Sequence, residues 1–505
     1  MMRRAALCFL CLCLAGPARA AVPAADCESP DPAKAIAGCG AVLAAGADMQ
    51  AYQFEAYNNR ALAELRLNQP EAALADARAG MALNPENGGI HVVAARALLA
   101  LGQPGAALRE VNEAIALIPN DPRPLILRGE IELTAGDWRA AIADQQAALD
   151  RDPANAGARL DLALAEVAGG EAAAAIADAS QAIALAPGDA AAYDARAAAE
   201  ALKGDAKAAL ADESQAIALS SGDPAFYQKR ALLELALNQP EAALKDLNQV
   251  LAYAPDDPRL RLQRAAAEDM LREWKAEIAD LTAVIEHAGD NRTMRYRALL
   301  LRASAYAAAS QPGPALADVN RAIALDPGAP EGYFARAQLE QRGGQLAAAI
   351  ADDTKAVGLD PKYIPAYADR SLAYAAQRRY GEAAADEARI LALMPGSAPD
   401  LNNYCWFLAL DGKPSQALPY CQQARTLAPH DPATLDSLGF VQLKLGEPKQ
   451  AILSYTEALR AAPHQASSLY GRALAEQALG ESAAAEADFA AARRYDPNIA
   501  KDFGS

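Results

Sequence analysis

Aromatic residues are scarce in this 505-residue chain: they make up 6% of it, whereas hydrophobic residues as a whole make up 52%. A β-sandwich or a β-barrel depends on aromatic and β-branched residues, so this composition argues against both. Alanine and leucine supply most of the apolar content, and alanine is the best helix former and lets helices approach closely. We therefore expect an all-α protein.

Basic residues are also in the minority. The chain has 47 Lys and Arg against 64 Asp and Glu, which gives a net charge of −17. Nucleic acids and anionic membrane surfaces repel such a chain, so we expect no nucleic acid among its partners.

The N-terminus has the features of a secretory signal peptide. Arg3 and Arg4 precede the apolar stretch Ala5 to Leu14, and Ala18-Arg19-Ala20 provides the small-x-small pattern of a cleavage site. This stretch is shorter than the about 20 residues that span a membrane, although an uncleaved anchor is the alternative. We expect residues 1–20 to be removed from an exported protein, periplasmic or secreted, that has no integral membrane segment after cleavage.

Cysteine is rare outside the signal peptide. Four cysteines follow it, in two pairs that are each close in sequence: Cys27 with Cys39, and Cys405 with Cys421. In an oxidising compartment an even number of cysteines indicates disulfide bonds, and free buried thiols are the alternative. Neither spacing is the C-x-x-C of a zinc or redox site.

Internal repetition decides the fold class. LNQPEAAL occurs at 67–74 and again at 237–244, and SQAIAL occurs at 180–185 and 214–219, so the copies are separated by multiples of 34 residues. Positions are numbered below from the first residue of each repeat. At this period the chain contains thirteen repeats, which start at residues 54, 88, 122, 156, 190, 224, 258, 296, 330, 364, 398, 432 and 466.

Small and turn-forming residues recur at fixed positions. Position 20 is Ala in all repeats but one, position 8 is Ala or Gly in all but two, and position 32 is Pro in all but two. Small residues at 8 and 20 let two antiparallel helices touch, and Gly, Asn or Pro near 15–17 makes the turn between them. The Pro at 32 ends the second helix. One helix pair cannot bury its own apolar face, so successive pairs must stack.

This pattern resembles the tetratricopeptide repeat, and the chain is similar to exported bacterial proteins of that family. The resemblance implies a right-handed superhelical solenoid of about thirteen helix pairs. Four extra residues separate two of the repeats, either as a longer surface loop or as a bend between two lobes. The expected order is an N-terminal cap segment (21–53), repeats 1–7 (54–291), the insertion (292–295), repeats 8–13 (296–499) and a C-terminal tail (500–505).

The cap segment resembles the entry segment of such exported repeat proteins. Pro32 to Leu43 would form a lone helix that covers the first repeat, which carries the sequence YNNR at residues 57–60. The resemblance implies that a disulfide between Cys27 and Cys39 holds this helix in place.

Opposite charges recur at positions 7 and 23. Nine repeats have Arg at position 7, and each of them has Asp at position 23. These positions lie almost opposite each other across the helix pair, so we expect an ion pair within each repeat or with its neighbour. A charged surface for a ligand is the alternative. The residues are Arg60 and Asp76, Arg128 and Asp144, Arg196 and Asp212, Arg230 and Asp246, Arg264 and Asp280, Arg302 and Asp318, Arg336 and Asp352, Arg370 and Asp386, and Arg472 and Asp488.

The resemblance also places a binding surface on the concave face, which positions 2, 5, 9, 12 and 13 tend to line in this family. Aromatic side chains with polar neighbours are typical of protein-binding hot spots. Packing between adjacent first helices is the alternative for those aromatics. The candidate partner-binding residues are Asn58, Leu62, Arg66 and Arg96 in the first repeats, and Asn402, Trp406, Asp436, Phe440 and Tyr470 in the last three.

Catalytic motifs are absent from the sequence: it has no HExxH, no GxSxG, no Walker loop and no GxGxxG after a strand. We expect no catalytic residue, no metal and no cofactor. The expected function is a non-catalytic scaffold of the periplasm or cell envelope that binds a protein or peptide in the concave groove, in an envelope complex. The alternatives are a structural spacer subunit of an envelope or secretion assembly, and an enzyme with an unrecognised site.

Overall fold

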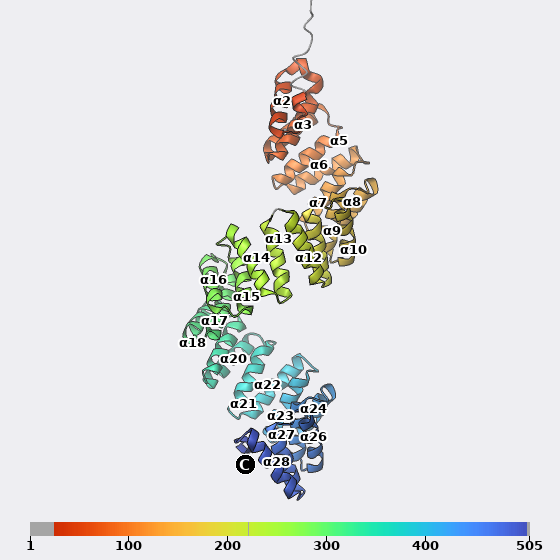
Figure 1. Cartoon of the computed structure of the whole chain (residues 1–505). Coiled ribbons are helices and arrows are strands. Elements are labelled where there is room, and N and C mark those ends of the chain that lie inside the picture. Colours follow the sequence, from red (N-terminus) through yellow and green to blue (C-terminus); the bar gives the residue numbers. More distant parts are fainter. Residues whose placement is uncertain (1–24, 221, 502–505) are drawn as a thin grey trace, which may run out of the picture. The chain divides into compact units, whose positions relative to one another are not determined.

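The computed structural model describes residues 25–220 and 222–501, and every regular element in these two ranges is a helix (Figure 1). The prediction of an all-α repeat protein is therefore confirmed. The chain divides into two compact parts between Tyr253 and Ala254, and each part is described by itself. The predicted signal peptide lies outside the described residues.

The N-terminal part begins with a short helical turn at residues 25–27, followed by a cap helix and a run of helix pairs. Its elements are α2 (Pro32–Ala44), the 3-10 helix η1 (Gly46–Tyr52), α3 (Gln53–Arg66), α4 (Pro70–Leu83), α5 (Gly88–Ala100), α6 (Pro104–Leu117), α7 (Arg123–Thr134), α8 (Trp138–Arg151), α9 (Ala156–Gly169), α10 (Ala172–Leu185), α11 (Ala190–Lys203), α12 (Ala206–Leu219), α13 (Pro224–Ala236) and α14 (Pro240–Tyr253).

The C-terminal part continues the same pattern of paired helices. Its elements are α15 (Pro258–Met270), α16 (Trp274–His287), α17 (Arg292–Ala308), α18 (Pro312–Leu325), α19 (Pro330–Arg342), α20 (Leu346–Leu359), α21 (Ile364–Ala376), α22 (Tyr380–Leu393), α23 (Ala398–Leu410), α24 (Pro414–Leu427), α25 (Pro432–Lys444), α26 (Pro448–Ala461), α27 (Ala466–Ala478), α28 (Ser482–Tyr495) and the 3-10 helix η2 (Ile499–Lys501).

The turn inside each helix pair has the same backbone conformation throughout. Position 15 has a positive φ in every repeat, a conformation that favours glycine because it has no Cβ. Eight repeats place Gly there, and the other five have Asn68, Asn238, Arg272, Ser310 and Arg378 with φ of 57–59°. The turn that the sequence predicts near positions 15–17 is thus confirmed.

Small residues bring the two helices of a pair together, as the pattern predicts. Positions 8 and 20 are buried in every repeat. Where a large side chain occupies this interior, the neighbouring positions are glycines, which have no side chain. The ring of Tyr455, 0% exposed, lies where a Cβ on Gly439 or Gly471 would come within 2.9 and 2.2 Å of it, respectively.

The cap helix α2 packs against α3, the first helix of the first repeat. Residues 26 and 27 cross α2 at Gly38, where an added Cβ would lie 2.5 Å from the backbone nitrogen of Cys27. Glycine is therefore required for this approach, which brings Cys27 next to Cys39.

The four extra residues of the insertion do not form a longer loop, which corrects one of the two sequence-based interpretations. They form the first turn of α17, which has 17 residues, and Asn291 caps it by accepting from the backbone nitrogen of Met294. Four residues add about one helical turn, so the rest of α17 keeps its phase against α18.

Candidate partner-binding surface and its charged framework

The predicted ion pairs between positions 7 and 23 form within each repeat. In all nine repeats the arginine donates from Nε to one carboxylate oxygen at 2.5–2.8 Å. It donates from Nη2 to the other oxygen at 2.6–3.0 Å. This parallel two-bond geometry is the strongest arrangement for the two groups, and it confirms the prediction.

In two repeats without arginine at position 7, a side chain at position 4 contacts the acid at position 23 instead. Arg159 Nη1 lies 2.6 Å from Asp178, and His91 Nδ1 lies 2.8 Å from Glu110. Both sites are one helical turn before position 7, on the same face of the first helix.

The two repeats without an acid at position 23 replace the ion pair with neutral contacts. The rings of Tyr404 and Tyr420 meet edge to face, with centroids 4.6 Å apart. In the next repeat Ser454 Oγ donates to Gln442 Oε1 at 2.8 Å, and Leu438 occupies position 7.

The same arginines also connect neighbouring repeats. Arg302 Nη1 donates to Thr282 Oγ1, at position 25 of the preceding repeat, over 2.7 Å. The further bonds of this kind are Arg128 to Asn112, Arg196 to Ser180, Arg230 to Ser214, Arg336 to Asn320, Arg370 to Thr354 and Arg472 to Thr456. One guanidinium group thus holds a helix pair and its neighbour in register, which accounts for the recurrence without a ligand.

A glutamate at position 11 belongs to the same framework, and the sequence analysis missed it. In five repeats its Oε1 lies 3.8–4.0 Å from the arginine Nε, and its Oε2 is buried without a partner. Burial, and then the charge of the aspartate at position 23, raises the pKa of Glu64, Glu132, Glu234 and Glu268 to about 7. Its recurrence four residues after the arginine was the available signal.

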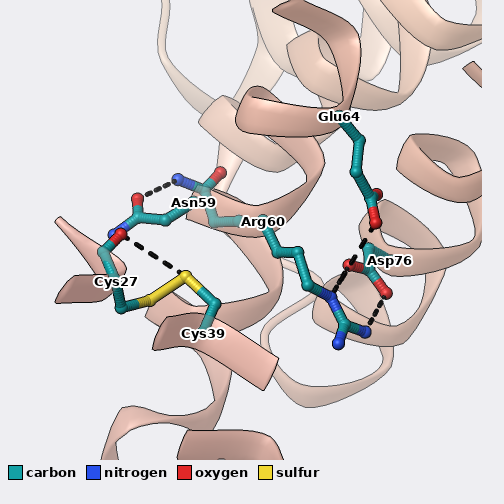
Figure 2. The surroundings of a disulfide bond; sticks show 7 residues. Cys27, Cys39, Asn59, Arg60, Glu64 and Asp76 are labelled. Atoms are coloured by element: carbon teal, nitrogen blue, oxygen red, sulfur yellow. Dashed lines mark hydrogen bonds and ion pairs between the residues drawn. A yellow bond between two sulfur atoms is a disulfide. The ribbon is translucent and has the colours of Figure 1, made fainter. Parts of the chain in front are cut away.

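Figure 2 shows this framework in the first repeat, where Arg60 extends between Asp76 and Glu64. The bonded sulfur atoms of Cys27 and Cys39 lie beside it, and the two Cα atoms are 4.4 Å apart. Cys405 and Cys421 are bonded in the same way across α23 and α24, with Cα atoms 5.4 Å apart.

The N-terminal candidate residues lie at or near the surface. Arg66 and Arg96 are exposed, Leu62 is 37% exposed, and Asn58 is half-buried. These four are therefore available for contact with a partner.

The C-terminal candidates are mostly covered, which corrects the prediction of an aromatic binding surface there. Phe440 and Tyr470 are 2% and 4% exposed. Trp406 is half-buried, and its ring centroid lies 4.8 Å from that of Phe440. The first helices α23, α25 and α27 contact one another in order, so packing between them, the alternative interpretation, holds for Phe440 and Tyr470.

The polar candidate residues of the C-terminal repeats are also buried or half-buried. Asp436 is 7% exposed and accepts from Ser468 Oγ at 2.5 Å, and burial raises its pKa to about 6. Asn402 is half-buried, and its Oδ1 has no hydrogen-bond partner. Asp436 therefore contributes to the packing of α25 against α27, through its hydrogen bond with Ser468.

Neither a metal centre nor a membrane-spanning helix occurs in the described ranges. No group of three or more His, Cys, Asp and Glu side chains there could hold a metal ion. Among the same residues, no helix has the length and apolarity needed to cross a membrane.

Comparison with known proteins gives the following matches. One model of the tetratricopeptide repeat (TPR) matches residues 64–131, and a second model matches residues 126–190 and 438–499. No curated protein matches the sequence. Among solved structures, a tetratricopeptide repeat protein from Parabacteroides merdae is 19% identical, with 50% of this chain and 98% of that chain covered and a TM-score of 0.38. The thermophilic TPR protein TTC0263 of Thermus thermophilus is 26% identical (36% and 98% covered, TM-score 0.32), and the TPR domain of P58(IPK) is 19% identical (78% and 98%, TM-score 0.28).

The regions between the matched segments have the same architecture as the segments themselves. Their helix pairs keep the turn at position 15 and the buried small residues at position 8. Stacked helix pairs of 34 residues are the defining feature of this family. The chain contains tetratricopeptide repeats, which the family models match over residues 64–190 and 438–499.

Proposed function

We propose that this protein is a non-catalytic, exported scaffold that binds a protein or an extended peptide along the concave face formed by its first helices. Tetratricopeptide repeats support a role in protein–protein interaction. The export signal in the sequence and the two cysteine pairs support a periplasmic or secreted location, in a complex of the cell envelope.

One observation supports the proposed position of the binding surface. Position 9, which the family resemblance places on the concave face, holds a leucine that packing leaves uncovered in three repeats: Leu62 is 37% exposed, Leu232 45% and Leu372 53%. Exposed apolar side chains at one repeated position, with charged residues around them, are typical of a surface that a partner covers.

The test uses substitutions at this position and a matched control elsewhere. Leu232→Glu and Leu372→Glu should each abolish or strongly weaken capture of the partner protein, because they place a charge in the contact. Leu453→Glu is the control: Leu453 is 67% exposed but lies on the second helix α26. All three variants should keep the melting temperature of the wild type, because none of the leucines is buried.

The readout is quantitative mass spectrometry of proteins cross-linked to the purified protein in an envelope extract. One stoichiometric partner that the Leu232 and Leu372 variants lose and the Leu453 variant keeps supports the proposal. Self-association as the only interaction would contradict it and would favour a spacer subunit. N-terminal sequencing of the exported protein should find residue 21 first.

A further inference from the structure

Position 24 of the repeat is an interior position, and in three repeats it carries an acid. Glu213 is 3% exposed, Asp353 0% and Glu387 2%. A buried carboxylate is unfavourable unless a cation or hydrogen-bond donors face it. The three acids differ in what faces them, above all in the residue sixteen positions later, at position 6 of the next repeat.

At Glu213 the chain provides its own cation. Lys229 Nζ forms an ion pair with Asp194, and the carboxyl group of Asp194 faces that of Glu213. One ammonium group therefore serves two acids at this point of the N-terminal part.

At Glu387 the chain provides a hydrogen-bond donor. Ser371 Oγ donates to Glu387 Oε1 at 2.7 Å, and the polar side chain of Asn403, at position 6 of the next repeat, favours the charged form of this carboxyl group. Glu387 therefore has a neutral donor at Oε1, although its Oε2 is buried without a hydrogen-bond partner.

At Asp353 the chain provides neither. Both carboxylate oxygens are buried without a hydrogen-bond partner, and position 6 of the next repeat is a second acid, Asp369. The other charged groups that influence Asp353 are Asp352, Asp386 and Arg370. These are already engaged in ion pairs, Arg370 with Asp386 and Asp352 with Arg336.

Asp369 connects this buried acid to the surface. It is half-buried on α21, one turn before the exposed Leu372. The Gln341 amide of α19, oriented with its nitrogen toward Asp369, donates to both carboxylate oxygens at 2.8 and 3.1 Å. Arg342 is the cation that acts on Asp369, and it is exposed.

We propose that the surface formed by Asp369, Leu372 and Gln341 above Asp353 binds a lysine or arginine side chain of an extended peptide partner. The inference rests on the proposed function and adds the chemistry of the partner. The cation takes the place that Lys229 occupies beside Glu213, and Leu372 contacts an apolar neighbour in the peptide. Two acids without a third ligand suit an ammonium or guanidinium group better than a metal ion, and no described group of side chains could hold a metal.

The first experiment selects ligands with the purified full-length mature protein from a phage-displayed library of random dodecapeptides. We expect the enriched peptides to share a Lys or Arg next to an apolar residue. Affinity is then measured by fluorescence anisotropy for a selected peptide and for a version in which its lysine is Nε-acetylated or its arginine is replaced by citrulline. Removal of the positive charge should weaken binding about tenfold or more.

The second experiment changes the protein. Asp369→Lys recreates the arrangement of Glu213 and Lys229. The new ammonium group should occupy the place of the peptide's cation, so binding of the basic peptide should be abolished without a lower melting temperature. Asp369→Asn should weaken binding about tenfold. Glu387→Gln is the matched control, because it changes a buried acid at the same position that already has a donor at Oε1, and binding should stay unchanged.

The outcomes separate the inference from the proposed function. Enriched peptides without basic residues, or equal binding to the wild type and to Asp369→Lys, would overturn the inference while the scaffold function stands. If no peptide is enriched and the cross-linking experiment also finds no partner, both proposals are wrong.

Discussion

Arg159 and Asp178 form an ion pair of 2.6 Å, although Arg159 lies at position 4 and not at position 7. The acid at position 23 therefore keeps its cation even where the usual arginine is missing. Since a buried carboxylate costs free energy when it is unpaired, the requirement is for a positive charge on this face of the first helix, and either of two sites one turn apart can supply it.

The best-buried pair gives a stability prediction. Arg302 and Asp318 are 8% and 3% exposed. Arg302→Leu should lower the free energy of unfolding by about 3 kcal/mol, because it leaves the buried Asp318 with only the exposed Arg321, whose Nη1 lies 3.2 Å from Oδ1. Urea unfolding followed by circular dichroism measures the change.

A double variant tests the reason for that loss. Arg302→Leu with Asp318→Ser reproduces Leu438 and Ser454, which the chain itself uses at these positions. It should recover most of the lost stability. A double variant no more stable than the single one would show that the loss does not come from the uncompensated charge of Asp318, and would leave the lost bond to Thr282 as the main cause.

The buried acids predict how stability depends on pH. Burial raises the pKa of Glu213 and Asp353 to about 8 and that of Glu387 to about 7. Such groups hold their proton more tightly in the folded state, so the stability that they contribute is complete below the unfolded pKa of about 4 and is lost as the pH rises toward the folded pKa. We expect a lower melting temperature at pH 8 than at pH 5.5.

Asp353→Asn should make this dependence shallower. The carboxyl group of Asp353 contributes at most about 1.4 kcal/mol per pH unit between the two pKa values. Asp290→Asn, at an exposed site, should leave the slope unchanged. A melting temperature that rises between pH 5.5 and pH 8 would contradict the assignment of these acids.

Two glycines of the cap helix provide a matched pair of substitutions. Gly38→Ala should lower the melting temperature and open the cap to proteolysis, since its Cβ would lie 2.5 Å from the backbone of Cys27. Gly40→Ala should be neutral or stabilising by up to about 1 kcal/mol, because the nearest atom is 3.9 Å away and alanine is the better helix former. Equal effects of the two substitutions would argue against the close approach at Gly38.

The cysteine pairs predict an oxidation state. Protein isolated from the exported fraction without reductant should resist alkylation at Cys27, Cys39, Cys405 and Cys421, and reduction should expose all four to the reagent in intact-mass analysis. Reduction of a pair should cost about 3 kcal/mol of stability, because each closes a short loop. Alkylation before reduction would show that the thiols are free.

The sequence by itself determines the helix pairs, the turn at position 15 and the ion pairs between positions 7 and 23. These features depend on a tight turn and on residues sixteen apart, such as Arg60 and Asp76, and the same local geometry recurs in every copy. The period of the sequence therefore predicts these features without any knowledge of how neighbouring repeats pack.

Only the tertiary structure decides which side chains the neighbouring repeats cover. Phe440 and Leu372 both occupy position 9, yet Phe440 is 2% exposed and Leu372 is 53% exposed. The difference arises because α23, α25 and α27 touch one another around the large ring, whereas Leu372 projects where no such packing covers it. The side-chain volumes in three successive repeats therefore decide whether position 9 is covered. The unpartnered state of Asp353 also depends on a neighbouring repeat, because its partner would have to come from position 6 of the following repeat.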